Sequence, residues 1–433
     1  MASRHTIVLA TAGLLVAAPL SAQRAQVTLA EAITMAEQAQ PRMVQALGQV
    51  RSTGTRVRTA RGAYLPNLNF SAGGSSSFSE SQRVNSTTGE IESGGSRSQS
   101  ISTQLSTSIE VFDGFRRGND LAVARANEAA ADAGLVDARF QQALQTTNQF
   151  LDALASRRLL IVREASVRRA EEQLKTSVAR LQAGAATRSD SLRSLVGVGN
   201  AQLQLLTTQA QLATAEANLG RLIGQSERVA ATDDSAFYRI VTAIDTAVLR
   251  GEAVARSPQV LSAEAAVRAS EAGLRASRSD YWPSLNLSAS YGLNGSSSND
   301  YTLLSRNSVG LSLSWPLFNR FGREQNVTLQ AIAVDNARAS AEEMRRLIVA
   351  NMTTQLANLE AARLRIEISG RSVEAAQEDL RVQQERYRLG ASTILDVLTT
   401  QEQLTQAEID AVNAWFDYLR AKAQIEALIG RSL

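Results

Sequence analysis

The stretch ERYRLGASTILDVLTTQEQL, residues 385–404, reads as two helices joined by a tight turn. Gly390 can adopt the left-handed backbone angles that commonly end a helix. Thr393 suits the N-cap of the next helix, and Asp396 suits its third position, where a carboxylate faces unpaired amides. The stretch therefore predicts a helical hairpin that turns at Gly390.

The same turn occurs a second time, 206 positions earlier. Residues 178–195, VARLQAGAATRSDSLRSL, place Gly184, Thr187 and Asp190 at the same spacing. Two further pairs of segments match: AYLPNLNFSA (63–72) with DYWPSLNLSA (280–289), and VFDGFRRG (111–118) with LFNRFGRE (317–324). Self-similarity of this kind indicates one supersecondary design used twice.

The repeats are expected to cover 23–224 and 258–433, and they differ in length at one place. Pro66 and Pro283 are 217 positions apart, whereas the phenylalanine motifs that follow are 206 apart. The second repeat therefore lacks eleven residues, which places the extra length in a Ser/Gly-rich segment, 79–98, expected to be a loop.

Each repeat contains a long run without proline, in which long helices can form. No proline occurs in 67–257 or 317–433, so nothing there interrupts a helix. Small and apolar residues recur every three or four positions, which is the spacing of a face packed on a partner helix. We expect helical hairpins over 114–224 and 320–430, each hairpin roughly 100 Å long because its long helix has about 65 residues at ~1.5 Å each. The predicted seams are Leu404, Ala407, Ala411, Ala414, Tyr418, Ala421, Ile425 and Leu428, and Val198, Ala201, Leu205, Thr208, Leu212, Ala215, Leu219 and Leu222.

Alternating apolar and polar residues predict a pair of strands in each repeat, near 65–112 and 284–317. Leu105 and Leu287 are expected to face lipid, and Ser106 and Ser288 a wet interior, as in membrane barrels. Four strands cannot close a barrel, because the smallest membrane barrels have about eight. An open edge in lipid would leave backbone groups unpaired, so two or three chains are expected to share one barrel.

The N-terminal residues 1–22 read as a secretory signal peptide. The apolar run of residues 7–18 is too short to span a bilayer and is followed by small residues around Ala22. No later stretch is apolar enough for a membrane helix. The sequence therefore predicts an exported chain that crosses a membrane only by strands.

The composition argues against most enzyme classes. The chain has no cysteine, and its one histidine, His5, lies in the signal peptide. Thiol and histidine catalysis and His- or Cys-based metal sites are therefore excluded from the mature chain. Its net charge of +3 comes from basic residues spread among acidic ones, which indicates solvated helix faces rather than nucleic-acid binding. We expect no catalytic residues, no cofactor and no metal.

On these features the chain resembles the TolC-type outer-membrane efflux proteins. The likeness is carried by RYRLGASTILDVLTTQEQL (386–404), by TLAEAITMAEQAQPRM (28–43) and by the twofold repeat, over nearly all of the mature chain. The resemblance implies a homotrimer with a twelve-stranded β-barrel in outer-membrane lipid, four strands from each chain. It also implies a coiled-coil α-barrel in the periplasm and an equatorial region at 225–257.

The resemblance also implies partners for the hairpin tips. Tip residues would contact a periplasmic adaptor protein, which joins the channel to an inner-membrane transporter; these are Gly184, Thr187, Asp190, Gly390, Thr393 and Asp396. In some channels of the family, rings of acidic residues close the end of the helical barrel that carries the tips. Glu378, Asp379 and Glu385 are therefore candidates for a periplasmic gate. A solvated helix face is the alternative interpretation of these acids.

Two hypotheses from different classes follow. The first is a passive export duct of a tripartite efflux or type I secretion system. The second is a trimeric coiled-coil surface protein held by a small barrel anchor. A surface protein predicts one terminal barrel segment, whereas strand pairs occur in both repeats, which favours the duct. The exported substrate does not follow from the sequence.

Overall fold

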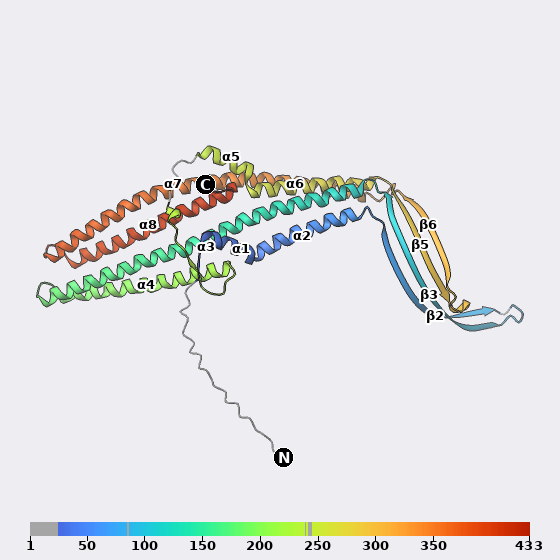
Figure 1. Ribbon diagram of the computed structural model, residues 1–433, viewed down its shortest axis with the longest axis horizontal. Coiled ribbons are helices and arrows are strands. Elements are labelled where there is room, and N and C mark those ends of the chain that lie inside the picture. Colours follow the sequence, from blue (N-terminus) through green and yellow to red (C-terminus); the bar gives the residue numbers. More distant parts are fainter. Residues whose placement is uncertain (1–24, 85, 239, 241–244) are drawn as a thin grey trace, which may run out of the picture.

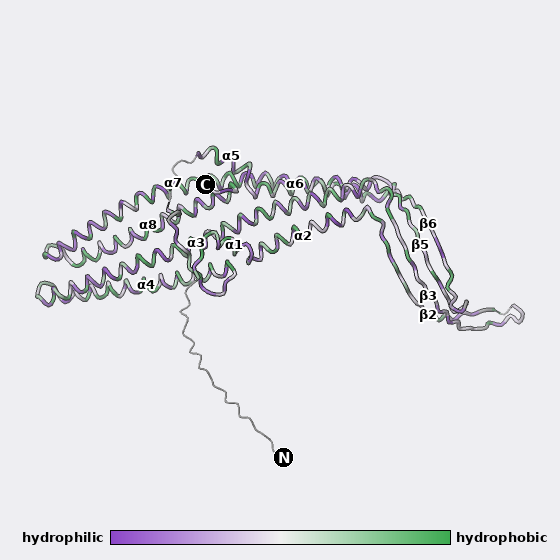
Figure 2. Tube along the Cα trace, viewed as in Figure 1, coloured by the Kyte–Doolittle hydropathy of each residue, from purple (hydrophilic) through white to green (hydrophobic). Residues whose placement is uncertain are grey.

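The computed structural model describes residues 25–84, 86–238, 240 and 245–433; the predicted signal peptide lies outside these residues. The molecule is long and narrow, with helices along most of its length and a sheet at one end (Figure 1). None of the helices in the described part of the chain is long and apolar enough to cross a membrane. Hydrophobic and hydrophilic residues are interspersed along these helices, without a long continuous hydrophobic segment (Figure 2).

Two long helical hairpins form the body of the molecule. Their first helices, α3 and α7, have 67 residues each, which corresponds to about 100 Å. Each then turns back into a shorter helix, and the two turns lie together at the end farthest from the sheet (Figure 1). The bounds are Arg116–Gln182 for α3, Arg188–Leu222 for α4, Gly322–Arg388 for α7 and Ile394–Ile429 for α8.

Shorter helices cover the half of α3 and α7 that lies nearer the sheet. Helix α2 packs on α3, and α6 packs on both α3 and α7. Pro41 and Pro258 are the first residues of these two helices, where the missing proline N–H would have had no helical partner. The bounds are Leu29–Ala39 for α1, Pro41–Gly62 for α2, Thr246–Arg256 for α5 and Pro258–Ser277 for α6.

A four-stranded antiparallel sheet continues from the helices. Its strand order is β2-β3-β5-β6, so β3 and β5 join the two halves of the chain. Strands β2 and β6 are the edges of this sheet, each hydrogen-bonded on one side within the described chain. The bounds are Asn67–Val84 for β2, Ile91–Phe112 for β3, Ser284–Ser296 for β5 and Leu304–Ser314 for β6.

The expectation of a loop over 79–98 was wrong for most of the segment. Strand β2 continues to Val84 and β3 begins at Ile91, so the hairpin extends well past the last β3–β5 pair, at Ser100. Serine side chains bridge its two strands, with Ser75 and Ser100 hydroxyls 2.8 Å apart. Serine and glycine usually indicate turns, but here their small side chains fit a close ladder of cross-strand pairs.

The sheet separates apolar from polar side chains as the alternation predicted. Leu105 pairs with Phe70 on β2 and Tyr291 on β5, all three exposed in the single chain. The adjacent residue, Ser106, pairs with Asn69 and Ser290 on the opposite face. One face is therefore rich in leucine and aromatic residues, and the other in serine and asparagine.

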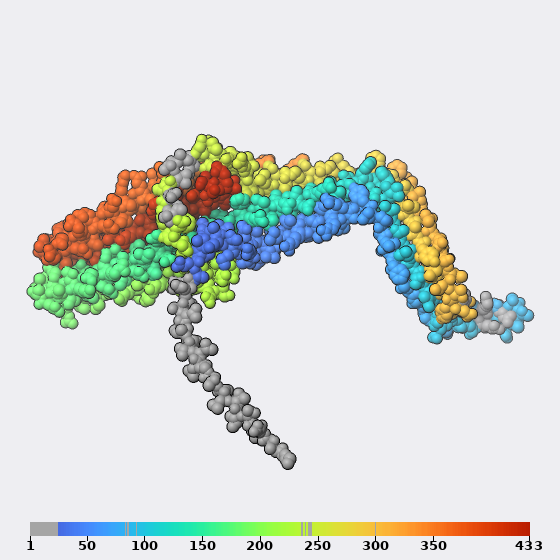
Figure 3. Space-filling view, viewed as in Figure 1, coloured from blue at the N-terminus to red at the C-terminus, as the bar shows by residue number. Residues whose placement is uncertain are grey.

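The main hydrophobic core lies near the middle of the long helices. It contains Phe150 and Leu154 of α3, Met352 of α7, and Tyr418 and Ile425 of α8, all with at most 2% exposure. The first strand, β1 (Gln26–Val27), pairs in parallel with β4 (Ala230–Ala231), and a 3-10 helix, η1 (Ser235–Tyr238), follows. In the space-filling view this segment crosses the middle of the bundle (Figure 3), where β4 contacts α3.

Candidate functional site

The first hairpin tip closes with the predicted turn chemistry. Gly184 has a φ of +73°, and the N–H of Ala185 donates to the carbonyl of Arg180 at 2.8 Å. Thr187 then caps α4: its Oγ1 accepts from the N–H of Asp190 at 3.3 Å. In return the Asp190 carboxylate accepts from the N–H of Thr187 at 3.0 Å. This reciprocal capping box confirms the predicted roles of these residues in the turn.

The second tip repeats these bonds 206 positions later. Gly390 has a φ of +80°, and the N–H of Ala391 donates to the carbonyl of Arg386 at 2.8 Å. Thr393 and Asp396 form the capping box, with N–H···O distances of 2.9 and 3.3 Å. The two tips therefore present the same backbone shape at the same end of the molecule (Figure 1).

Two arginines in these turns were missed by the sequence analysis. Arg180 donates from Nη2 to the carbonyl of Ala185 at 3.0 Å, and Arg386 donates in the same way to Ala391 at 3.3 Å. Each arginine, in the last turn of its helix, thus bonds to a backbone carbonyl of the turn that follows the left-handed glycine. The sequence contains a pattern that could have identified them: the two arginines are also 206 positions apart, and each precedes the glycine of its turn by four residues.

The tips differ in what supports them. Beneath the second tip, Tyr387, Ile394 and Val397 form a separate hydrophobic cluster with Leu380 and Leu404. Beneath the first tip the corresponding contact is polar: the hydroxyls of Ser177 and Ser194 are buried and 2.8 Å apart. The second tip is therefore held by apolar packing, and the first by buried hydrogen bonds.

The second tip also exposes a large apolar residue and a strongly bonded carboxylate. Leu389, next to the glycine, is 76% exposed. The pKa of Asp396 is lowered from the usual aspartate range by hydrogen bonds from the Thr393 backbone and hydroxyl and from the Ser392 hydroxyl. This carboxylate therefore stays ionised at neutral pH and keeps the cap closed.

The three candidate gate acids lie on α7 before the second tip. The Glu378 carboxylate accepts two hydrogen bonds from Arg381, at 2.7 and 2.9 Å, which lower its pKa. Glu385 accepts from Arg388 at 3.1 Å, and Asp379 is exposed. Two of the three acids are thus engaged along their own helix.

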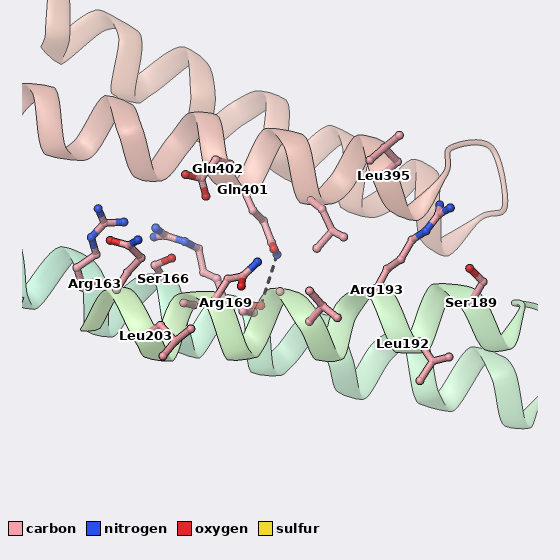
Figure 4. A pocket seen from close by; sticks show the side chains of 17 residues that line it. Arg163, Ser166, Arg169, Ser189, Leu192, Arg193, Leu203, Leu395, Gln401 and Glu402 are labelled. Carbon is pink, nitrogen blue, oxygen red and sulfur yellow. Dashed lines mark hydrogen bonds between the residues drawn. The ribbon is translucent and has the colours of Figure 1, made fainter. Parts of the chain in front are cut away.

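Polar bonds between α3 and α8 join the two hairpins of the chain. Arg169 donates to the Glu408 carboxylate at 2.7 and 3.0 Å and to the Thr405 hydroxyl at 3.1 Å. The Gln401 side chain donates to the backbone carbonyl of Arg169 at 3.4 Å, the bond drawn dashed in Figure 4. An open groove of about 800 Å³ lies beside this network, with Leu203 of α4 on one wall.

A sheet with one apolar and one polar face at one end, and paired helical tips at the other, are the parts of a tubular outer-membrane channel. The comparison with protein families agrees: the model of the outer membrane efflux protein family matches residues 32–225 and 249–431, and the chain belongs to this family. It is therefore an outer-membrane efflux protein whose helices lie in the periplasm.

Individual relatives show the same likeness over most of their length. The pyoverdine export outer membrane protein OpmQ of Pseudomonas putida is 28% identical over 89% of this chain and 82% of its own. The outer membrane protein TolC of Escherichia coli is 23% identical over 87% and 76%. The crystal structure of VceC from Vibrio cholerae has a TM-score of 0.76 at 18% identity, over 93% of this chain and 96% of its own. These relatives are channel or export proteins rather than enzymes.

Proposed function

We propose that three copies of this chain form a passive exit duct for an efflux or type I secretion system. The observation that carries the proposal is the four-stranded sheet with edges β2 and β6. Lipid cannot satisfy the outer backbone groups of these strands, so the edges must pair with further copies. Two copies would give eight strands with a filled interior, whereas three give twelve with room for a lumen.

The polar face of the sheet fits the lining of such a lumen. The residues on the face of Ser106 are mainly serine, asparagine and glutamine, with few charges. A wet, nearly neutral wall lets many solutes pass and selects weakly among them. Selection of the cargo would then belong to the inner-membrane transporter, and the chain described here would supply the passage.

The tips are the proposed contact with a periplasmic adaptor. Their shared backbone shape supports this role, because three chains would set six similar turns in one ring. Exposed Leu389 adds an apolar contact that a helical hairpin of the adaptor could cover. A gate formed by Glu378, Asp379 and Glu385 near this ring stays a prediction.

The test is site-specific photocrosslinking in living cells. A photoreactive residue is placed at Leu389, at Ala183 in the first tip, and at the exposed control position Thr353 in the middle of α7. Products are identified by mass spectrometry, and export is followed by comparing culture supernatants of the deletion strain with and without the gene.

The proposed function expects the same periplasmic adaptor to be captured from both tips and not from Thr353. It also expects at least one exported compound or protein to disappear from the supernatant when the gene is deleted. Equal capture from all three positions, or an unchanged supernatant under every growth condition tried, would contradict it.

A further inference from the structure

The sheet carries very little charge where all four strands run side by side. This part of the sheet comprises residues 67–75, 100–112, 284–296 and 304–314. Within these ranges the charged residues are Glu110, near the end of β3 that leads into α3, and Arg306 on β6. A charge in this part of the sheet is therefore an exception that calls for a reason.

Arg306 belongs to the polar face of the sheet. It pairs with Gly292 on β5, which pairs with Gln104 on β3, and Ser71 on β2 completes the row. Residues two positions apart on a strand share a face, and Gln104 precedes Ser106 by two positions. The face that would line the lumen therefore carries a positive charge at this level.

The guanidinium of Arg306 is not neutralised by a neighbouring acid. The residue is exposed, and it makes no hydrogen bond or ion pair with any residue that the structure describes. Glu110 lies in the row of Ser312, six positions from Arg306 along β6, or about 20 Å away. The screening length at physiological salt is only about 8 Å. Asp300, in the connection between β5 and β6, is exposed and forms no ion pair with the arginine.

The first repeat shows that the fold does not need an arginine at this position. Ser100 lies 206 positions before Arg306, and Ser75 lies 217 positions before Gly292. The two serines pair, with their hydroxyls 2.8 Å apart. The second repeat has glycine and arginine in their places. The arginine thus adds a charge to the polar face without adding a bond to the sheet.

We propose that Arg306 sets the charge preference of the duct, favouring solutes that carry carboxylate, phosphate or sulfate groups over cations. The inference rests on the proposed multi-chain duct and deepens it, because copies related by rotation would place their arginines at one level of the lumen. Rings of arginine select for anions in pores, and a low-dielectric wall focuses their field. A guanidinium also matches the paired oxygens of carboxylate and phosphate.

The two charges of this face would act at different levels of the lumen. Glu110 lies at the end of the sheet next to the helices. Arg306 lies at the opposite end, two positions from the last β5–β6 pair, Asn294 and Leu304. Because the helices lie in the periplasm, a solute on its way out would meet the arginines after the glutamates. The charge preference at the exit therefore depends on Arg306.

Ion selectivity in planar bilayers of phosphatidylcholine tests this role. Under a KCl gradient, the zero-current potential gives the ratio of chloride to potassium permeability. Arg306→Gln should lower this ratio at least about twofold, Arg306→Lys should retain it, and the difference should shrink at high salt. The matched control is Arg97→Gln, which removes the same charge from an exposed position on the apolar face of β3, beyond the four-stranded part.

A second measurement does not require ions to pass the helical end of the channel. The chain has no native cysteine, so Ser102→Cys places a single thiol on the polar face of β3, two strand spacings or about 10 Å from β6. Its rates of reaction with a negatively and a positively charged methanethiosulfonate are compared in outer-membrane trimers at low salt. Adding Arg306→Gln should lower the ratio of the two rates at least about threefold, and adding Arg97→Gln should leave it unchanged.

Three results would overturn the inference. An unchanged permeability ratio in a conducting Arg306→Gln channel, or an unchanged rate ratio at the Ser102 thiol in any trimer, would refute it and leave the proposed duct intact. A Ser102 thiol that neither charged reagent reaches would also refute it, because the face would not line a wet lumen. A protein that stays a single chain in detergent would refute the inference and the proposed duct together.

Discussion

The guanidinium of Arg169 on α3 is bonded twice to the carboxylate of Glu408 on α8, which lies 239 residues further along the chain. Their side chains are 22% and 17% exposed, so water screens this pair less than most ion pairs of the molecule. The pair fixes one hairpin against the other close to the tips. It is one of several bonds that hold α3 and α8, and with them the two hairpins, in place relative to each other.

Removing one partner of this pair should loosen the hairpins. We expect Arg169→Gln or Glu408→Gln alone to lower the free energy of unfolding by about 1.5–3 kcal/mol, because a half-buried charge loses its hydrogen bonds. The double variant should cost clearly less than the sum of the two, since both changes remove the same contact. The free energy of unfolding of each variant is measured by urea titration monitored by circular dichroism. The control is Arg168→Gln, because Arg168 is exposed. Strictly additive effects would show that the pair contributes nothing.

Replacing the tip glycines should weaken docking without disturbing assembly. Gly184→Ala and Gly390→Ala place a side chain at a φ of +73° and +80°, at a local cost of about 1–2 kcal/mol. We expect normal channel levels in outer membranes and reduced adaptor crosslinking from each changed tip. Gly370→Ala is the matched control, since it lies within α7 with open space around it. Undiminished crosslinking in the double variant would leave the turns as helix caps alone.

The two faces of the sheet should tolerate charge differently. Leu105→Arg should destabilise the protein by about 2–4 kcal/mol if this face meets lipid near the middle of the bilayer. Ser106→Arg should have a small effect, because its face would line the lumen. Leu287→Arg and Ser288→Arg form a second matched pair on β5. Refolding into lipid vesicles measures the difference, and equal losses within each pair would refute the assignment of the faces.

The second tip should keep its cap through the range of periplasmic pH. The folded-state pKa of Asp396 lies below the ordinary aspartate value of 3.8, so its bonds stabilise the tip at every pH above that value. The stabilisation is lost only as pH falls through the lowered pKa. Hydrogen exchange of the Asp396 amide should thus show protection that is constant from pH 5 to 8 and falls below about pH 4. In Asp396→Asn the protection should be lower at pH 7 and change little with acidification.

The sequence predicts the tips well because every constraint on them is local. A glycine, a threonine and an aspartate within seven positions define the turn. The same three residues recur 206 positions away at the same spacing, which a chance match would not explain. The long helices are predicted for a related reason, since the absence of proline and steps of three and four residues are also local signals. Their buried seam residues, such as Leu404 and Tyr418, follow from the same steps.

Features that depend on distant parts of the chain were not predicted. The bond between Arg169 and Glu408 requires knowing that α8 packs on α3, which periodicity does not reveal. The strand extension at 79–98 was interpreted as a loop because serine and glycine favour turns in isolation. Only cross-strand partners such as Ser96 for Ser79, with hydroxyls 3.2 Å apart, make that segment a ladder.

The central claim is that three copies share one barrel, and the native mass of the protein extracted from outer membranes tests it most directly. Native mass spectrometry in detergent should give three times the mass of the mature chain, unchanged on dilution above the critical micelle concentration. A stable species of one chain, with the edges β2 and β6 protected from hydrogen exchange, would contradict the claim.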